Sequence, residues 1–263
     1  MSVVIKRLWT AVGGMARHAR LIARNGARLL LAFVIMPACA GPLVLDSGTR
    51  QVTLLELYTS QGCSSCPPAE RWLNGFVDDD DLWKAIVPVA LHVDYWDYLG
   101  WQDPYATTAN GERQRELARA GRASTVYTPG FFANGREWRG WTLRLPPRAS
   151  GREPGRLGAS IDNNVLTATF THDRAPLELH VAVLGFGIDT DVERGENRNR
   201  SLRQEFVALT HDVYTSPDGR WRVALPVIDP KAAKRLGIAL WVSASGDDRP
   251  LQATGGWLQD MAR

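Results

Sequence analysis

Cysteine is scarce in this sequence, which has only Cys39, Cys63 and Cys66 among 263 residues. So few cysteines exclude a domain held together by several disulfides, and they exclude a site with four cysteine ligands. Cys63 and Cys66 are spaced C-x-x-C, and a disulfide across so short a loop restricts the unfolded chain only slightly. The pair is therefore expected to take part in thiol chemistry or in metal binding.

The N-terminal part of the chain lacks an apolar run long enough to span a bilayer, which needs about 20 residues. Its apolar run covers only residues 29–36. Basic residues precede this run, and Ala38, Cys39 and Ala40 follow it, which is the pattern of a cleaved signal segment over residues 1–40. The mature protein is then expected to start near Gly41 and to be periplasmic or secreted. A lipid on Cys39, or an uncleaved segment, would instead attach the protein to a membrane.

Acidic residues are absent from the first 40 positions, which hold six of the 31 basic residues. The formal charge of +3 therefore belongs to the precursor, because residues 41–263 have 25 basic residues against 28 acidic ones. A slightly acidic mature chain does not favour binding to phosphate groups. Nucleic acid is accordingly excluded as an expected partner.

Alternating strand and helix patterns predict an α/β domain over residues 51–145. Gln51–Tyr58 and Ile86–Val93 are apolar segments typical of buried strands, and Val126–Asn134 predicts a third strand. Apolar residues at helical spacing follow Cys66, and Gly111–Arg122 predicts a second helix. The C-x-x-C pair is thus expected in a tight loop between a strand and a helix N-terminus.

The second half of the chain has a different pattern. Residues 146–158 are rich in proline, glycine and arginine and predict a linker. Short β segments without a long amphipathic helix follow, so residues 159–260 are expected to form a mostly β, sandwich-like domain of unknown role. The predicted architecture is therefore an α/β domain followed by a separate β domain.

The two cysteines are expected to have different roles in thiol chemistry. A helix N-terminus stabilises a thiolate on the first cysteine of such a pair. Cys63 is therefore predicted to be the nucleophile and the more exposed and more acidic thiol, with Cys66 as the resolving thiol.

Thr128 and Pro129 supply a second indication of function. In thioredoxin-like folds, a cis proline before a central strand lies against the dithiol and leaves backbone groups free to bind an extended peptide. The Thr128–Pro129 bond is therefore expected to be cis, although a trans proline at a strand start is the commoner case. Glu56, in the strand before the cysteine loop, is expected to assist proton transfer to Cys66, with an arginine-paired or solvent-facing carboxylate as the alternative.

Several segments near the predicted site allow more than one interpretation. His92 could complete a metal site with Cys63 and Cys66 for a soft ion such as Cu(I), or it could be a core histidine. The aromatic residues between Asp94 and Tyr105 fit a partner-binding wall or simple packing. In the charged run Glu193–Arg200, the residues at 195–197 either face the cysteine domain or are solvated surface.

Four segments resemble a known family, namely ELYTSQGCSSCPPAE, HVDYWDYLGWQDPYA, VYTPGFFANG and RGENRNRSL. They look like the motifs of DUF1223, a thioredoxin-like bacterial family of unknown function. The resemblance extends from about Gln51 to near the C-terminus, and it implies an exported protein with a thioredoxin-like domain but no settled substrate. Gly130 departs from the family pattern, where a larger polar residue follows the proline, and this departure would loosen contacts to a partner.

Together these features predict an exported thiol–disulfide oxidoreductase that needs no cofactor. Cys63, Cys66, Thr128, Pro129 and Glu56 are its predicted site residues, and its partners are disulfide- or thiol-containing proteins or small molecules. The alternatives are a copper-binding or chaperone-like protein that uses Cys63, Cys66 and His92, and a binding module with an inert disulfide.

Overall fold

The structure is a computed structural model that describes residues 41–172 and 176–258. The predicted signal segment, Cys39 and the predicted cleavage site after Ala40 lie outside the described residues. No helix within the described ranges is long and apolar enough to cross a membrane. The described residues belong to one compact unit that begins at Gly41.

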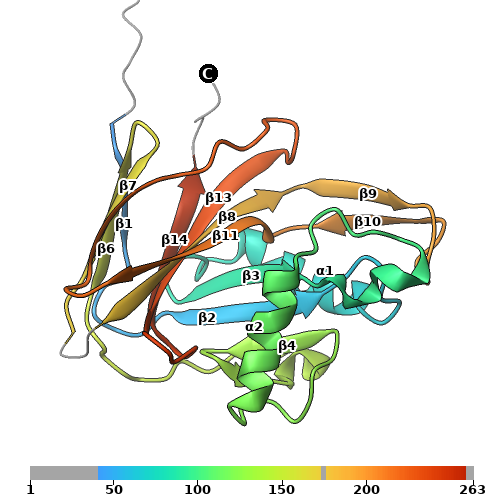
Figure 1. The fold of residues 1–263 in the computed structure, drawn as a ribbon, viewed down its shortest axis with the longest axis horizontal. Coiled ribbons are helices and arrows are strands. Elements are labelled where there is room, and N and C mark those ends of the chain that lie inside the picture. The colour runs from blue at the N-terminus through green and yellow to red at the C-terminus, as the bar shows by residue number, and fades with distance from the viewer. Residues whose placement is uncertain (1–40, 173–175, 259–263) are drawn as a thin grey trace, which may run out of the picture. The chain divides into compact units, whose positions relative to one another are not determined.

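The described residues form three sheets. The main sheet has eight strands in the order β14-β13-β8-β11-β3-β2-β4-β5, a second sheet has the order β1-β6-β7-β12, and β9 and β10 form a two-stranded hairpin (Figure 1). The strands of the main sheet are β2 (Thr53–Thr59), β3 (Ile86–His92), β4 (Gly130–Ala133), β5 (Arg136–Glu137), β8 (Leu177–Phe186), β11 (Val207–Ser216), β13 (Arg235–Ala244) and β14 (Pro250–Leu258).

The remaining elements are fewer and shorter. The second sheet consists of β1 (Leu43–Asp46), β6 (Leu157–Asp162), β7 (Val165–Phe170) and β12 (Arg220–Ala224), and the hairpin consists of β9 (Ile188–Val192) and β10 (Arg200–Gln204). The helices are α1 (Pro67–Asn74), α2 (Thr108–Arg119) and the 3-10 helices η1 (Gly75–Asp78), η2 (Asp94–Leu99) and η3 (Gly140–Leu143).

The predicted α/β thioredoxin-like domain followed by a separate β domain is wrong. The described residues are mostly β, with fourteen strands against two α-helices, and one sheet combines strands from both halves of the chain. β3 pairs in parallel with β11, where Val207 lies opposite Ala90 and the Ala90 N–H donates to the Phe206 carbonyl at 2.8 Å. The main sheet therefore crosses the boundary that was predicted at residues 146–158.

The physical reason for the error lies in the edge of β3. All seven residues of β2 and all seven of β3 are buried, as their apolar sequences predict. A buried strand needs partners for its backbone groups on both edges. The sequence does not reveal which distant strand supplies the partner on the far edge of β3, and here it is β11, more than a hundred residues away.

Two apolar cores result from this arrangement. One surrounds β2, β3 and α1 and includes Tyr58, Phe131 and Trp241. The other lies between the second sheet and the strands β8 and β13, and it includes Leu157 and Phe170 of the second sheet and Leu240 of β13. The second sheet thus covers the main sheet at a distance from the cysteines.

The hairpin of β9 and β10 is the element that links the second half to the cysteine region. It projects from the ends of β8 and β11 toward α1 (Figure 1). Asn74, at the end of α1, donates its amide to the Arg203 carbonyl at 2.8 Å and accepts from the Glu205 N–H at 3.2 Å. These bonds fix the hairpin beside the helix that follows the cysteines.

A buried ion pair joins β2 to α2. The Nε of Arg113 donates to Glu56 Oε1 at 2.8 Å, and the Tyr58 hydroxyl donates to the same oxygen at 3.2 Å. Glu56 is 0% exposed and Arg113 is 6% exposed. Arg113 also reaches Asp248 at 3.4 Å, in the loop before β14. The pair therefore ties three distant segments together in a low-dielectric environment.

Breaking this pair should destabilise the fold strongly. Replacement of Arg113 by Met leaves the Glu56 carboxylate buried without its cation, which is expected to cost about 3–5 kcal/mol of unfolding free energy. Urea denaturation measures the loss. The matched double replacement Glu56→Leu with Arg113→Met removes both charges and should recover much of it. A loss under about 1 kcal/mol for the single variant would contradict this assignment.

Two histidines lie side by side on the main sheet, and His180 is buried while His211 is half-buried. The ring of His180 on β8 stacks on Trp241 with centroids 4.8 Å apart, and its Nδ1 lies 3.2 Å from His211 Nε2 on β11. Burial, with a smaller contribution from the Arg113 charge, lowers the pKa of His211 to about 3. Burial also lowers the pKa of His180 well below its ordinary value, and the charges of Arg113 and His211 act in the same direction.

These depressed values predict a loss of stability in mild acid. Between pH 6.5, the ordinary histidine value, and the folded pKa of about 3, the unfolded chain binds more protons than the folded protein. The free energy of unfolding should therefore decrease as the pH is lowered below about 6.5. The decrease should reach up to about 1.4 kcal/mol per pH unit for each histidine. His211→Phe should flatten the slope in urea titrations at pH 7 and pH 4.5. An unchanged slope would show that His211 does not contribute.

Candidate functional site

The cysteine pair lies in a turn between β2 and α1. Cys63 and Cys66 form a disulfide, with their Cα atoms 5.5 Å apart. The Cys63 N–H donates to the Ser60 carbonyl at 3.1 Å, and the Cys66 N–H donates to the Cys63 carbonyl at 3.2 Å. The short span of backbone between the strand end and the helix thus holds both sulfurs in one turn.

The start of α1 offers few free donors. Cys66 is the N-cap residue, and Pro67 and Pro68, which follow it, have no backbone N–H. The next two N–H groups, of Ala69 and Glu70, donate to the Cys66 carbonyl at 2.9 and 3.1 Å. The Ser65 hydroxyl lies 3.3 Å from the Cys63 sulfur and is the polar group that contacts it.

The prediction that Cys63 is the more exposed thiol is wrong. Both cysteines are 0% exposed, whereas Ser64 and Ser65 between them are exposed. A molecule approaching from solvent therefore meets the two serines before it meets either sulfur.

Thr128 and Pro129 lie next to this turn. The Thr128–Pro129 bond is cis, and the Thr128 hydroxyl accepts a hydrogen bond of 2.7 Å from the indole N–H of Trp96. Pro129 and Ser65 line the same hollow, of about 530 Å³, together with Tyr127 and Trp141. The structure thus brings together the cysteine turn and the Thr128–Pro129 segment, which are about 65 residues apart in the sequence.

Gly130 permits the close packing behind Pro129. A side chain at this position would place its Cβ 2.8 Å from the Tyr127 carbonyl and 3.0 Å from the Gln114 amide nitrogen. That amide donates to the same carbonyl at 2.7 Å. The glycine therefore leaves room for α2 to hold the Tyr127 backbone.

Glu56 is placed away from the cysteine chemistry that was predicted for it. Its described contacts are with Arg113 and Tyr58. This agrees with the alternative expectation, in which Glu56 is paired with an arginine. Another acid, Glu70, lies in α1 one turn after Cys66 and is 4% exposed. It accepts from the Thr59 hydroxyl at 2.7 Å and from the Gln204 amide at 3.1 Å. Burial raises the pKa of Glu70, against the opposing effect of the His92 charge and these two hydrogen bonds.

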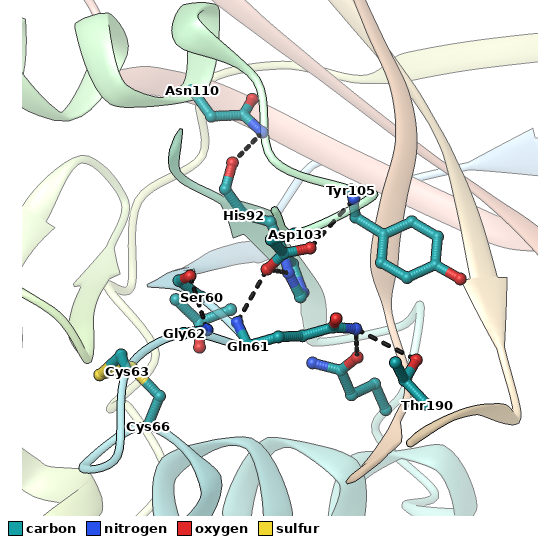
Figure 2. A network of polar contacts seen from close by, with 12 residues as sticks. Ser60, Gln61, Gly62, Cys63, Cys66, His92, Asp103, Tyr105, Asn110 and Thr190 are labelled. Carbon is teal, nitrogen blue, oxygen red and sulfur yellow. Dashed lines mark hydrogen bonds and ion pairs between the residues drawn. A yellow bond between two sulfur atoms is a disulfide. The ribbon is translucent and has the colours of Figure 1, made fainter. Parts of the chain in front are cut away.

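His92 belongs to a buried polar network behind the turn (Figure 2). Its Nδ1 lies 2.6 Å from Asp103 Oδ2, and both side chains are buried. Burial alone would lower the pKa of His92, but the charge and hydrogen bond of Asp103, with help from Glu70, raise it. The same interaction lowers the pKa of Asp103 although burial acts to raise it. Asp103 Oδ2 also accepts from the Gln61 N–H at 2.8 Å.

These residues do not assemble into the predicted alternative metal site. His92 is engaged with Asp103, and its ring stacks edge-on against Tyr105 with centroids 5.7 Å apart. In residues 41–172 and 176–258, no three or more His, Cys, Asp or Glu side chains are grouped so that they could hold a metal ion. The grouping of Cys63, Cys66 and His92 as ligands is therefore not found.

Gln61 connects the network to the second half of the chain (Figure 2). Its amide donates to Gln204 Oε1 at 2.7 Å and to the Thr190 hydroxyl at 3.1 Å, on the two strands of the hairpin. Its side-chain oxygen accepts from the Trp101 indole at 3.0 Å. The residue two positions before Cys63 is thus fixed by β9, by β10 and by the segment after η2.

The loop between β9 and β10, residues 193–199, contacts the cysteine turn directly. The Asn197 amide donates to the carbonyls of Gln61 and Cys63 at 2.9 and 2.8 Å. Glu196 Oε2 accepts from the Ser64 N–H at 2.9 Å. Of the two interpretations of this charged run, the contact with the cysteine region is confirmed for Glu196 and Asn197.

The model of the family described as a protein of unknown function, DUF1223, matches residues 54–243, which include the cysteine turn, Pro129 and the loop 193–199. The chain belongs to the DUF1223 family. No curated protein matches the chain.

Two solved structures are similar to this DUF1223 protein. One is a crystal structure of a structural-genomics protein from Agrobacterium tumefaciens, with 28% identity and a TM-score of 0.59 over 82% of this chain and 98% of that one. The other is HBP35 of Porphyromonas gingivalis, with 14% identity and a TM-score of 0.51 over 82% of this chain and 79% of that one. The second likeness concerns the fold alone.

Sequence reasoning missed four polar residues of this DUF1223 site. Asp103, Glu70, Gln61 and Gln204 are all buried, and each bonds to a segment distant in the chain. Only Glu70 carried a sequence signal, because it lies four residues after Cys66 and hence on the same helix face. The others depend on contacts between segments that the sequence does not place together.

Asn197 should be the main anchor of the cysteine turn. It is 0% exposed, so Asn197→Ala leaves two carbonyls at the turn without their donor, and we expect a loss of about 2–3 kcal/mol in unfolding free energy. Amide hydrogen exchange at residues 61–66 should also accelerate. Arg198→Ala, an exposed neighbour, is the control and should change neither measurement. Equal effects from the two variants would show that Asn197 is no special anchor.

Proposed function

We propose that this DUF1223 protein is a thiol–disulfide oxidoreductase that acts outside the cytoplasm on disulfide- or thiol-containing proteins. The observation that carries this proposal is the Cys63–Cys66 disulfide in a turn whose exposed serine borders a hollow of about 530 Å³. A redox-active pair needs a place where a partner can lie beside the sulfurs. The hollow between Ser65, Pro129 and Trp141 is such a place once the turn moves, because Ser65, which lines it, contacts the Cys63 sulfur.

In the reduced protein, the Cys63 thiolate attacks one sulfur of a partner disulfide and displaces the other as a thiolate. The product is a mixed disulfide between Cys63 and the partner. The Cys66 thiolate then attacks the Cys63 sulfur, which restores the Cys63–Cys66 disulfide and releases the partner's second thiolate. Two electrons pass to the partner, and the same steps in reverse oxidise a partner dithiol.

The position of the hollow supports Cys63 as the residue that bonds to the partner. Ser65 lines the hollow, and its hydroxyl oxygen is 3.3 Å from the Cys63 sulfur. Cys66 is instead the N-cap of α1, and its carbonyl accepts hydrogen bonds from the N–H groups of Ala69 and Glu70. Because both cysteines are 0% exposed, exchange requires a local movement of the Ser64–Ser65 turn.

The side chains around the hollow favour a polypeptide partner. Trp141 and Tyr127 offer aromatic surface, and Thr142 and Arg139 offer polar groups beside it. Such a mixture suits an extended chain with alternating side chains and a polar backbone. The export pattern of residues 1–40 supports the periplasm or the exterior as the compartment, where disulfides persist.

A trapping experiment tests the proposal. Cys66→Ser removes the resolving thiol, so reduced protein treated with glutathione disulfide should accumulate one stable adduct on Cys63, detected by intact mass. Cys63→Ser is the matched control and should form much less adduct, because its remaining thiol is the one that starts α1. The wild-type protein should distribute between dithiol and disulfide across a glutathione series.

Three results would contradict the proposal or its assignment of roles. A disulfide that resists every glutathione ratio would be inert, and the protein would not be an oxidoreductase. Absence of an adduct on Cys66→Ser would remove the mixed-disulfide step. Faster adduct formation on Cys63→Ser would reverse the roles of the two cysteines.

A further inference from the structure

A carboxylate from the second half of the chain lies against the cysteine turn. Glu196 Oε2 accepts a hydrogen bond of 2.9 Å from the N–H of Ser64, the residue that follows Cys63. Bonds from the Ser64 side chain, and then from its backbone, lower the pKa of Glu196. The carboxylate is therefore ionised at neutral pH, and it is on the solvent side of the turn.

The backbone around Glu196 is held in place. Its neighbour Asn197 is 0% exposed, donates to the carbonyls of Gln61 and Cys63, and accepts from Arg200 at 3.0 Å. On the other side, Gly195 has a φ of +73°, which favours glycine. A Cβ added at this position would lie 3.4 Å from the Trp101 side chain. The charge of Glu196 is thus fixed beside the turn by its two neighbours.

We propose that Glu196 is a positioning residue that opposes ionisation of Cys63 and so favours the disulfide over the reduced form. This inference rests on the proposed function, because it assigns a control on the same thiol chemistry. Reduction of the disulfide by two electrons creates a thiolate on Cys63 unless the sulfur takes up a proton. A negative charge nearby disfavours the thiolate. The N–H of Ser64, the residue after Cys63, is already bound to the carboxylate.

Other charged groups also face the turn, and the test must leave them unchanged. Glu70 on α1 bonds to Thr59, and Asp103, which pairs with His92 on β3, accepts from the Gln61 N–H. Arg200 on β10 bonds to Asn197, and Arg194 and Arg198 line the same hollow as Glu196. A substitution at Glu196 alone leaves all six of these groups in place and changes only its own charge.

The experiment compares Glu196→Gln with Glu193→Gln, each in the Cys66→Ser background that leaves Cys63 as the thiol of the turn. Glutamine keeps an oxygen that accepts from Ser64 N–H and removes the charge. Iodoacetamide alkylation of Cys63 is measured across pH and at low and high salt. Glu193 lies on the same loop and lines the same hollow of about 640 Å³ as Glu196, but the described contacts of the turn do not include it.

Removal of the Glu196 charge should raise the rate of alkylation at pH 7 by about threefold at low salt, because a carboxylate beside the turn disfavours the Cys63 thiolate that reacts. The pH profile should move to lower pH, and the difference should shrink in high salt. In the variants that keep both cysteines, the glutathione equilibrium should shift toward the dithiol by a similar factor. Glu193→Gln should match the parent protein in all of these measurements.

The outcomes separate this inference from the proposed function. An identical pH profile for Glu196→Gln and its parent, or an equal shift for Glu193→Gln, would overturn the role of Glu196 while leaving exchange intact. A wild-type disulfide that never exchanges with glutathione would overturn the proposed function, yet alkylation of Cys63 would still report on Glu196. Equal urea midpoints for the two glutamine variants confirm that neither substitution acts through unfolding.

Discussion

The parallel pairing of β3 with β11 is the interaction on which the rest of the structure depends. β3 is buried at all seven positions, and β11 covers the edge that β2 leaves open. The pairing is short, with Val207 opposite Ala90 as its one register pair, whereas on its other edge β11 pairs with β8 along its length. It nevertheless brings the ends of β8 and β11 close to the end of β3. From there the hairpin of β9 and β10 projects toward α1 (Figure 1), and the loop at its tip bonds to the cysteine turn.

Several buried polar residues behind the turn form hydrogen bonds that join the first half of the chain to the second. Gln204 on β10 bonds to both Glu70 and Gln61, and Asn197 bonds to the carbonyls on either side of Gly62. Buried polar groups without partners are costly, so each of these bonds restricts the position of the turn. The position of the cysteine turn thus depends on the assembled sheet as well as on its local sequence.

The sequence predicted those features that depend on neighbouring residues, and it did not predict those that depend on contacts between distant segments. The strands at Gln51–Tyr58 and Ile86–Val93, and the short β segments of the second half, were predictable because burial and period are local signals. The division into an α/β domain and a β domain was wrong because strand pairing over more than a hundred residues leaves no such signal. For the site, the two cysteines and Pro129 were evident in the sequence. Asp103 and Gln204 were not, since a single polar residue in an apolar segment does not show its partner.

The same long-range dependence bears on where the function resides. The family match spans residues 54–243, so it contains both the cysteine turn and the loop 193–199 that contacts it. A fragment limited to residues 51–145 would expose the edge of β3 and would lack Gln204, Asn197 and Glu196. Its Gln61 and Glu70 would then lose donors or acceptors in a buried site, which destabilises the turn by more than the loss of one surface bond. The cysteine pair and the hairpin therefore form one structural unit, although the sequence separates them by more than 120 residues.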